Sequence, residues 1–316
     1  MPLVKTNFEP TYLLRNGHLN TILNSLIRKP ESLSYKRERI ITPDDDFLDV
    51  DFHKKGNGKV AILCHGLEGS SDSNYIQGMA TLLSKKGFDI VALNYRFCSG
   101  EINKQLKSYH AGDTSDLNLV INLIEPDYKE IYLVGFSLGS NLILKYLGDQ
   151  KYKLSTKIRA AAAVSALVDL EGASLELSKP KNVIYSKRFI KTLAEKMKLK
   201  HQQYPDDVDI DKLSKVKKVI DFDDYFTSVM NGFKDAKDYY SKSNSLQFLK
   251  NIETPTLIIN ALDDPFASKS CVPTKEAKAN DNLYLMTPKY GGHVGFYEFN
   301  KKHLWSEERI VEFFIK

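Results

Sequence analysis

The sequence has few of the features that mark secreted, membrane-spanning or nucleic-acid-binding proteins. Its 316 residues include three cysteines, and no pair has CxxC spacing, which argues against a zinc site or a redox pair. No apolar stretch approaches the length that spans a bilayer, and the opening MPLVKTNFEP has no apolar core of a secretory signal. The net charge is +5, but no block of like charge stands out. We therefore expect a cytoplasmic protein with reduced thiols, no transmembrane segment and no nucleic-acid partner.

The composition and the apolar pattern suit an α/β fold. Hydrophobic residues make up 42% of the chain, enough for a substantial core. Residues 1–35 show no clear period, and RERIIT (37–42) and FLDVDF (47–52) are predicted as an antiparallel pair. Beyond them, short apolar runs alternate with segments of helical spacing, which predicts a mostly parallel sheet with helices on both faces. The expected buried strands are 59–66, 88–95, 130–136, 158–166, 255–262 and 282–287.

One connection between consecutive strands is much longer than the others. It runs from about 167 to 250, whereas a crossover usually needs about a dozen residues or somewhat more. Apolar residues at helical spacing predict that this segment is a helical insertion, which forms a lid over a single domain of residues 1–316. Candidate wall residues of an apolar pocket beneath it are Phe189, Met197, Phe222 and Met230, although each could instead belong to the core of the lid.

Ser137 stands between two glycines in the sequence GFSLG. The strand expected at 130–136 precedes it, and an apolar helix expected at 138–149 follows it. In this context G-x-S-x-G is typical of a nucleophile elbow, a sharp turn at which side chains in the flanking positions would clash. The helix N-terminus also favours the negative charge that develops during acyl transfer. The motif therefore predicts that Ser137 is a nucleophile exposed above the sheet.

A serine nucleophile needs a base and an acid that orients the base, in the chain order Ser, acid, His for this architecture. His293 lies in the loop KYGGHVGF after the last strand, at the same sheet edge as the serine, whereas His303 lies at the start of the last helix. We favour His293 as the base. Asp263 and Asp264 both follow the strand at 255–262. We favour Asp264, because a residue before proline is held extended, but the two could exchange roles.

An oxyanion hole needs two backbone N–H donors. One is expected from Leu138, the residue after the nucleophile, and the other from Leu67 in the loop after the first parallel strand. Gly66 allows the close backbone approach that this arrangement requires. For His65 we expect a structural hydrogen bond beneath the hole, and for Glu68 a solvated position on the loop.

Other polar residues are predicted to have structural roles. His18 and His110 have no metal-ligand spacing with each other, and the run Asp44–Asp46 looks like turn chemistry. Arg96 is expected to tether loops, and Cys98 to pack near the site. No metal and no cofactor are expected.

Several phrases of the sequence together resemble a known family. They are RNGHLNTIL, HGLEGSSDSNYIQG, NYRFCSGEIN, SYHAGDTSDL, GFSLGSNLILKYLGD, ALDDPF and GGHVGF. The chain resembles the α/β-hydrolase superfamily and, within it, the YheT-like esterase family, over nearly its whole length. It departs from the family at Gly17, where proline is frequent, and at Phe97, where glycine is usual.

The resemblance implies a carboxylic-ester hydrolase for short- to medium-chain acyl groups, with Ser137 as nucleophile, Asp264 as acid and His293 as base. We thus expect a serine hydrolase that acts through an acyl-enzyme on a small-molecule acyl ester. Two alternatives stay open: an acyltransferase that uses the same triad with an alcohol acceptor, and a ligand-binding protein on a hydrolase scaffold. Enzymes of the dehalogenase and epoxide-hydrolase types carry aspartate at the elbow, which Ser137 excludes.

Overall fold

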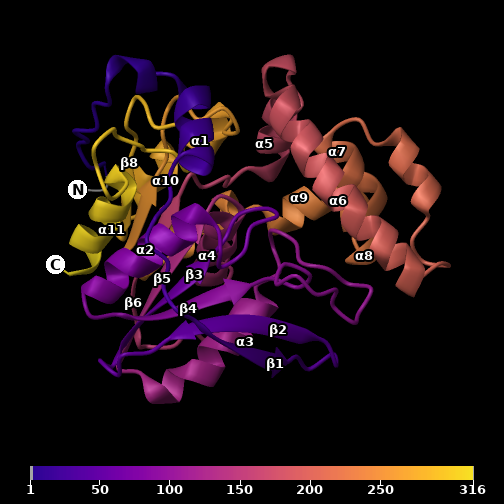
Figure 1. Cartoon of the computed structure of the whole chain (residues 1–316), viewed down its shortest axis with the longest axis horizontal. Coiled ribbons are helices and arrows are strands. Elements are labelled where there is room, and N and C mark those ends of the chain that lie inside the picture. Colours follow the sequence, from indigo (N-terminus) through magenta and orange to yellow (C-terminus); the bar gives the residue numbers. More distant parts are fainter. Residues whose placement is uncertain (1–2, 316) are drawn as a thin grey trace.

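The computed structural model describes residues 3–315, within which eight strands form one sheet (Figure 1). The strands are β1 (Lys36–Ile41), β2 (Phe47–His53), β3 (Lys59–Cys64), β4 (Asp89–Asn94), β5 (Glu130–Phe136), β6 (Ile158–Val164), β7 (Thr256–Ile259) and β8 (Leu283–Met286). Their order in the sheet is β1-β2-β4-β3-β5-β6-β7-β8. β2 pairs antiparallel with β1 and β4, and the pairings from β4 to β8 are parallel. The predicted mostly parallel sheet is confirmed.

Helices cover both faces of this sheet, because alternate residues of each strand point to opposite sides. Val60, Ile62 and Cys64 of β3 belong to the core cluster that contains α3 (Ser115–Ile124) and α4 (Leu138–Gly148). Ala61 and Leu63 belong to the opposite cluster, with α2 (Asn74–Lys85) and α11 (Trp305–Phe314). The central strands are buried on both faces, which explains their continuous apolar sequences.

α4 is the most enclosed of these helices. Within Leu138–Gly148, every residue except Lys145 is buried. A Cβ atom at Gly148 would collide with the carbonyl oxygen of Phe248, in the 3-10 segment Leu246–Asn251. The helix therefore lies between the sheet and this segment, as its apolar faces predicted.

The segment between β6 and β7 is helical. It contains α5 (Leu170–Leu177), α6 (Val183–Gln203), α7 (Val219–Phe222), a π-helical turn (Asp223–Thr227), α8 (Ser228–Met230) and α9 (Ala236–Ser243). Figure 1 shows α6, α7, α8 and α9 grouped together, beyond one side of the sheet. These helices have a core of their own, and Met230 is buried in it with Leu193 and Phe226. Met230 is not among the residues that line the cavity beside Ser137, so it belongs to the core of the helical segment and not to the cavity wall.

The first 35 residues contain a helix that the sequence did not predict. A 3-10 turn (Tyr12–Leu14) is followed by α1 (Gly17–Leu26), which begins after the N-cap Asn16. The side chain of Asn16 accepts a hydrogen bond from the Leu19 N–H. The buried residues of α1 are Gly17, Asn20 and Asn24. The sequence shows no apolar helical period here because the buried face of α1 is polar. The short helix α10 (Thr274–Ala279) was also not predicted.

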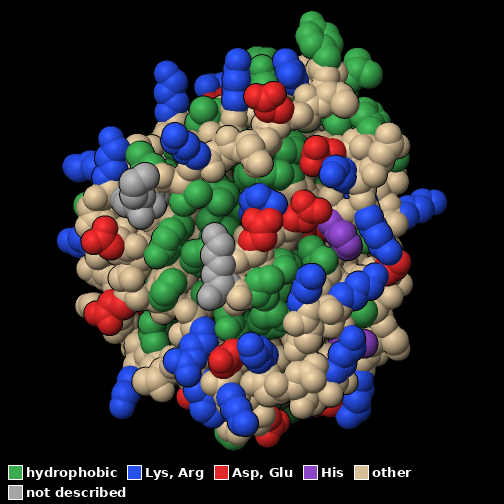
Figure 2. Space-filling view, turned by 90° about the vertical axis from the view of Figure 1, so that its left-hand side faces the viewer, with side chains coloured by type: hydrophobic (Ala, Val, Ile, Leu, Met, Phe, Trp, Pro, Cys, Tyr) green, Lys and Arg blue, Asp and Glu red, His purple; other side chains and the backbone are tan. Residues whose placement is uncertain are grey.

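The surface agrees with the scattered charges of the sequence. Figure 2 shows a face on which lysine and arginine side chains are spread among acidic and apolar ones. Within residues 3–315, no helix combines the length and the apolar character that a membrane crossing requires. Cys64, Cys98 and Cys271 are buried, and none of them forms a disulfide with another described residue.

Candidate active site

Ser137 occupies the sharp turn between β5 and α4, as the motif predicted. Its backbone has φ 54° and ψ −115°, a conformation that costs a residue with a side chain about 1–3 kcal/mol. A Cβ atom at Gly135 would collide with the backbone of Gly139, and one at Gly139 would collide with the carbonyl oxygen of Cys64. The expectation that flanking side chains would clash is confirmed. The turn places the serine at the N-terminus of α4.

Three side chains form a continuous hydrogen-bonded chain at this turn. Ser137 Oγ lies 2.8 Å from His293 Nε2, and His293 Nδ1 lies 2.8 Å from Asp264 Oδ2. A carboxylate only accepts hydrogen bonds, so the Nδ1 atom carries the proton and Nε2 is free to accept one from the serine. The ring of Phe266 lies 4.2 Å from the imidazole, centroid to centroid, and helps to fix its plane.

The two neighbouring aspartates have different partners. Besides His293, Asp264 accepts a hydrogen bond through Oδ1 from the Phe266 N–H, at 2.8 Å. Asp263 instead accepts one from the Gly292 N–H, at 2.9 Å. The structure thus places Asp264 beside the imidazole and Asp263 against the backbone of the histidine loop.

The unpredicted helix α1 supports the loop that carries His293. The hydroxyl of Thr21 accepts a hydrogen bond from the His293 N–H at 2.8 Å, and Asn24 donates one to the carbonyl of Val294 at 2.6 Å. Val294 has a left-handed φ of 53°, which such bonds help to maintain. Sequence reasoning missed these residues, because hydroxyl and amide side chains on a buried face give no apolar period.

Two backbone N–H groups near the serine are candidates for an oxyanion hole. Within residues 3–315, the N–H groups of Leu67 and Leu138 have no hydrogen-bond partner. A Cβ atom at Gly66 would lie 3.2 Å from the Ser137 Cβ, so the backbone before Leu67 runs directly past the serine. These observations are compatible with two oxyanion donors at Leu67 and Leu138, and that role stays a prediction.

The side chain of His65 stabilises the loop that carries Gly66 and Leu67. Its Nδ1 atom lies 2.7 Å from the Gly66 carbonyl oxygen, and its Nε2 atom accepts a hydrogen bond from the Tyr95 N–H at 3.2 Å. Burial lowers the pKa of His65 to about 3, so the ring is neutral and its proton lies on Nδ1. The expected structural hydrogen bond is confirmed.

Glu68 is not the solvated loop residue that the sequence suggested. Its side chain is only 8% exposed, and its backbone has a left-handed φ of 56°. Oε1 accepts hydrogen bonds from the Tyr109 hydroxyl at 2.7 Å and from Lys196 Nζ at 2.8 Å. Lys196 belongs to α6. The ion pair therefore connects the helical segment directly to the residue after Leu67.

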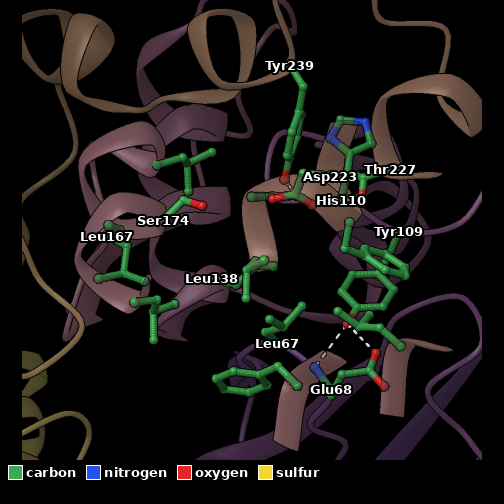
Figure 3. Close-up of a pocket in the computed structure, with 18 of the residues that line it drawn as sticks. Leu67, Glu68, Tyr109, His110, Leu138, Leu167, Ser174, Asp223, Thr227 and Tyr239 are labelled. Carbon is green, nitrogen blue, oxygen red and sulfur yellow. Dashed lines mark hydrogen bonds between the residues drawn. The ribbon is translucent and has the colours of Figure 1, made fainter. Parts of the chain in front are cut away.

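Ser137 lies where two cavities meet. The inner cavity is lined mainly by apolar side chains of α5, α6 and α7, including Phe189, Met197 and Phe222. The outer cavity reaches His293 and has more polar walls. Tyr185, which stacks on His18, is among its lining residues. Figure 3 shows Leu67 and Leu138 lining the inner cavity.

Other polar residues named from the sequence lie outside this cluster. The guanidinium of Arg96 contacts Asp44 at 2.6 Å, Asp46 at 3.2 Å and Asp116 at 2.9 Å, which confirms that it tethers loops. His303 lies before α11, 3.8 Å from Glu307, and does not contact the serine.

The fold and this geometry agree with the comparison to known proteins. The family model described as the alpha/beta hydrolase fold matches residues 60–299. The chain belongs to the α/β-hydrolase family, and it is a YheT-like member. It is 32% identical to YheT of Escherichia coli (strain K12), over 96% of this chain and 92% of that protein.

Two further relatives extend the similarity. Phospholipase ABHD3 of Homo sapiens is 31% identical over 94% of this chain and 75% of its own length. Monoacylglycerol lipase of Saccharomyces cerevisiae is 28% identical over 88% of this chain and 63% of its own length. Among solved structures, the Pyrococcus furiosus esterase Pf2001 superposes with a TM-score of 0.61. It covers 91% of this chain and 97% of its own, at 18% identity, and supports the fold alone.

Proposed function

We propose that this protein hydrolyses small-molecule carboxylic esters of short- to medium-chain acids through an acyl-enzyme on Ser137. The observation that carries the proposal is the hydrogen-bonded chain from Ser137 through His293 to Asp264, located where two cavities meet. Relatives named phospholipase and monoacylglycerol lipase support an ester substrate.

In the first half of the reaction, Ser137 Oγ attacks the ester carbonyl and its proton passes to His293 Nε2. Asp264 stabilises the imidazolium that results. The oxyanion accepts hydrogen bonds from the Leu67 and Leu138 N–H groups. Removing one such donor in enzymes of this kind costs about 10²–10³ in kcat.

The tetrahedral intermediate then collapses. The bond to the leaving alcohol breaks, and His293 returns the proton from Nε2 to the alcohol oxygen. A water molecule attacks the acyl-enzyme and gives its proton to His293, and the carboxylic acid leaves as Ser137 regains its proton. No step requires a metal or a cofactor.

The two cavities suggest how the ester is oriented. The inner cavity is apolar and contains both proposed oxyanion donors, so the acyl chain is assigned to it. The outer cavity contains polar residues such as Asn24, Ser73 and Arg188, so the alcohol is assigned there. Burial of each acyl methylene in the inner cavity contributes about 0.8 kcal/mol.

The test is the hydrolysis of p-nitrophenyl esters over a series of acyl lengths, by wild type and Ser137→Ala, with a fluorophosphonate label on both. We expect turnover and labelling in wild type and neither in the variant. A wild type that binds the esters but neither labels nor turns over would contradict the proposal and favour a ligand-binding protein.

Acyl transfer is the second candidate, because the polar outer cavity would admit an alcohol in place of water. Adding a short alcohol to the same assay and measuring the new ester separates the two activities. Hydrolysis is the function if free acid remains the main product at high alcohol concentration.

A further inference from the structure

The inner cavity contains a group of polar side chains among its apolar walls. Asp223, Thr227, His110 and Tyr239 all line it. Figure 3 shows these four side chains gathered together, with Leu138 between them and Leu67. They come from the segment before α3, the π-helical turn and α9, and the proposed reaction uses none of them. An apolar acyl cavity would not need such a group.

Asp223 is the centre of this polar cluster. Thr227 donates a hydrogen bond to Oδ1 at 2.7 Å, and Tyr240 donates one to Oδ2 at 2.6 Å. Within the described part of the chain, no lysine or arginine forms an ion pair with this carboxylate. Burial raises the pKa of Asp223 to about 6, because the two hydroxyl donors offset only part of the lost hydration. Each oxygen of this carboxylate accepts one hydrogen bond and has a second lone pair, so Asp223, which lines the cavity, retains acceptor capacity.

His110 supplies a complementary donor. Its Nδ1 atom accepts a hydrogen bond from the Gly112 N–H at 3.1 Å. Burial lowers the pKa of His110 to about 4, so the ring is neutral at physiological pH and its proton lies on Nε2. That N–H has no hydrogen-bond partner within residues 3–315. The cavity thus offers both an acceptor and a donor.

The backbone around Asp223 is also unusual. Residues Asp223–Thr227 form a π-helical turn between α7 and α8. π-helical turns are rare and occur frequently at functional sites, because the extra residue redirects side chains. Here the turn allows Thr227 to bond the carboxylate of Asp223 from the same element.

We propose that this polar cluster binds a hydroxyl group carried by the distal part of the acyl chain. The hydroxyl donates to Asp223 and accepts from His110 Nε2–H, and the intervening methylenes lie against the apolar walls. A distal carboxylate is disfavoured, because it would face the negative charge of Asp223. The inference rests on the proposed function, since it assigns the acyl chain to the inner cavity.

The experiment compares p-nitrophenyl esters of straight-chain acids with their ω-hydroxy counterparts, pair by pair over a series of lengths. At the length that reaches Asp223, we expect wild type to prefer the hydroxylated ester by about tenfold in kcat/KM, the effect of one well-placed hydrogen bond. Asp223→Leu should reverse this preference. The isosteric Asp223→Asn, which retains an acceptor oxygen, should keep part of it.

The acetate ester, which is too short to reach the cluster, is the control in every variant. Unchanged acetate turnover in Asp223→Leu shows that the variant is folded and that its triad works. If wild type hydrolyses acetate but shows no preference at any length, or Asp223→Leu keeps the preference, the subsite is overturned and the esterase proposal stands. A stronger preference for ω-amino esters would also overturn the hydroxyl assignment.

Calorimetric binding of the same ester pairs to Ser137→Ala repeats the comparison without turnover. We expect the hydroxylated ester to bind about tenfold more tightly at the selected length, and equally or less tightly when Asp223→Leu is added. Equal affinities of both esters for Ser137→Ala at all lengths would contradict the subsite even if the protein proves inactive.

Discussion

Two adjacent aspartates at the end of β7 provide a sharp test at the residue scale. Asp264 accepts a hydrogen bond from the His293 imidazole, whereas Asp263 accepts one from the Gly292 backbone. We expect Asp264→Asn to lower kcat by about 10⁴, because an amide favours the wrong imidazole tautomer. The matched variant Asp263→Asn should lower it by less than about tenfold. Steady-state kinetics on one ester measures both, and a larger loss in Asp263→Asn would reverse their assignment.

The buried imidazole of His65 predicts a pH dependence of stability. Its folded-state pKa is about 3, below the usual value near 6.5, because burial disfavours the charged ring. Between these values the unfolded chain binds a proton that the folded chain does not. The stabilising contribution is therefore complete above about pH 6.5 and is lost as the pH falls towards 3. Urea unfolding at several pH values should show this decrease.

The variant His65→Asn separates this effect from general acid denaturation. Asparagine keeps a donor for the Gly66 carbonyl but does not titrate. We expect this variant to have a lower free energy of unfolding than wild type at pH 7. Between pH 6.5 and 4, its free energy of unfolding should decrease less steeply than that of wild type. An unchanged slope would show that other groups govern the acid transition.

Both residues that depart from the family resemblance lie at structurally demanding positions. A Cβ atom at Gly17 would collide with the carbonyl oxygen of Asp263, so this α1 residue packs directly on the aspartate turn. Phe97 has a left-handed φ of 64°, where glycine would be unstrained. Its ring lines the inner cavity and lies 5.1 Å from Lys196 Nζ. The phenyl ring thus contributes to the cavity wall and to the contact with α6.

At the scale of elements, the ion pair between Lys196 and Glu68 connects α6 to the proposed oxyanion loop. Lys196→Met should lower kcat severalfold, because Glu68 loses one of the two groups that fix it beside Leu67. It should also lower the melting temperature, because the buried Glu68 carboxylate is left without its cationic partner. Lys198→Met, on the exposed side of the same helix, is the matched control and should be neutral.

A double-mutant cycle with Glu68→Gln tests whether the pair acts as a unit. Directly contacting residues give coupling energies of about 0.5–3 kcal/mol, whereas independent effects add. Additive losses in kcat would show that Lys196 acts through another contact.

A second ion pair joins the end of the α1 segment to α11. Arg28 forms two hydrogen bonds with Glu307, at 2.8 and 2.7 Å, and their side chains are 6% and 0% exposed. Arg28→Met would leave a buried carboxylate without its partner and should cost about 3–5 kcal/mol of unfolding free energy. Lys85→Met, which breaks an exposed pair with Glu31, should have little effect on the free energy of unfolding. If denaturant titrations show that Arg28→Met and Lys85→Met lower the free energy of unfolding equally, the buried pair is no more important for stability than the exposed one.

At the scale of the whole molecule, the inner cavity exists because the helical segment between β6 and β7 packs over the end of the sheet where Ser137 lies. Ala173 of α5 is buried and lines this cavity. Ala173→Phe should shift the preferred acyl length towards shorter chains, because the ring fills space that the chain would occupy. The ratio of kcat/KM for long and short esters measures the shift.

Turnover of the acetate ester is the control for Ala173→Phe, since overpacking a core costs about 1–3 kcal/mol. Unchanged acetate turnover with an unchanged length preference would place the acyl chain outside the inner cavity.

Local patterns of the sequence determined the positions of the strands along the chain, the elbow at Ser137, and the positions of His293 and the aspartate pair at strand ends. Each depends on neighbours within a few residues: an alternating or continuous apolar run, a turn residue, a glycine that avoids a clash. The C-terminal ends of parallel strands meet at one edge of the sheet, so these residues were expected to lie near one another.

Tertiary structure alone decided the remaining features. α1 is held by buried amides and hydroxyls, which give no apolar period, and its partner is the His293 loop at the other end of the chain. The choice between Asp263 and Asp264 depended on which carboxylate faces the imidazole. The polar cluster joins His110 to Asp223, far apart in sequence, because packing of the helical segment against the sheet brings them to one cavity. Such contacts depend on the whole fold, and no local pattern encodes them.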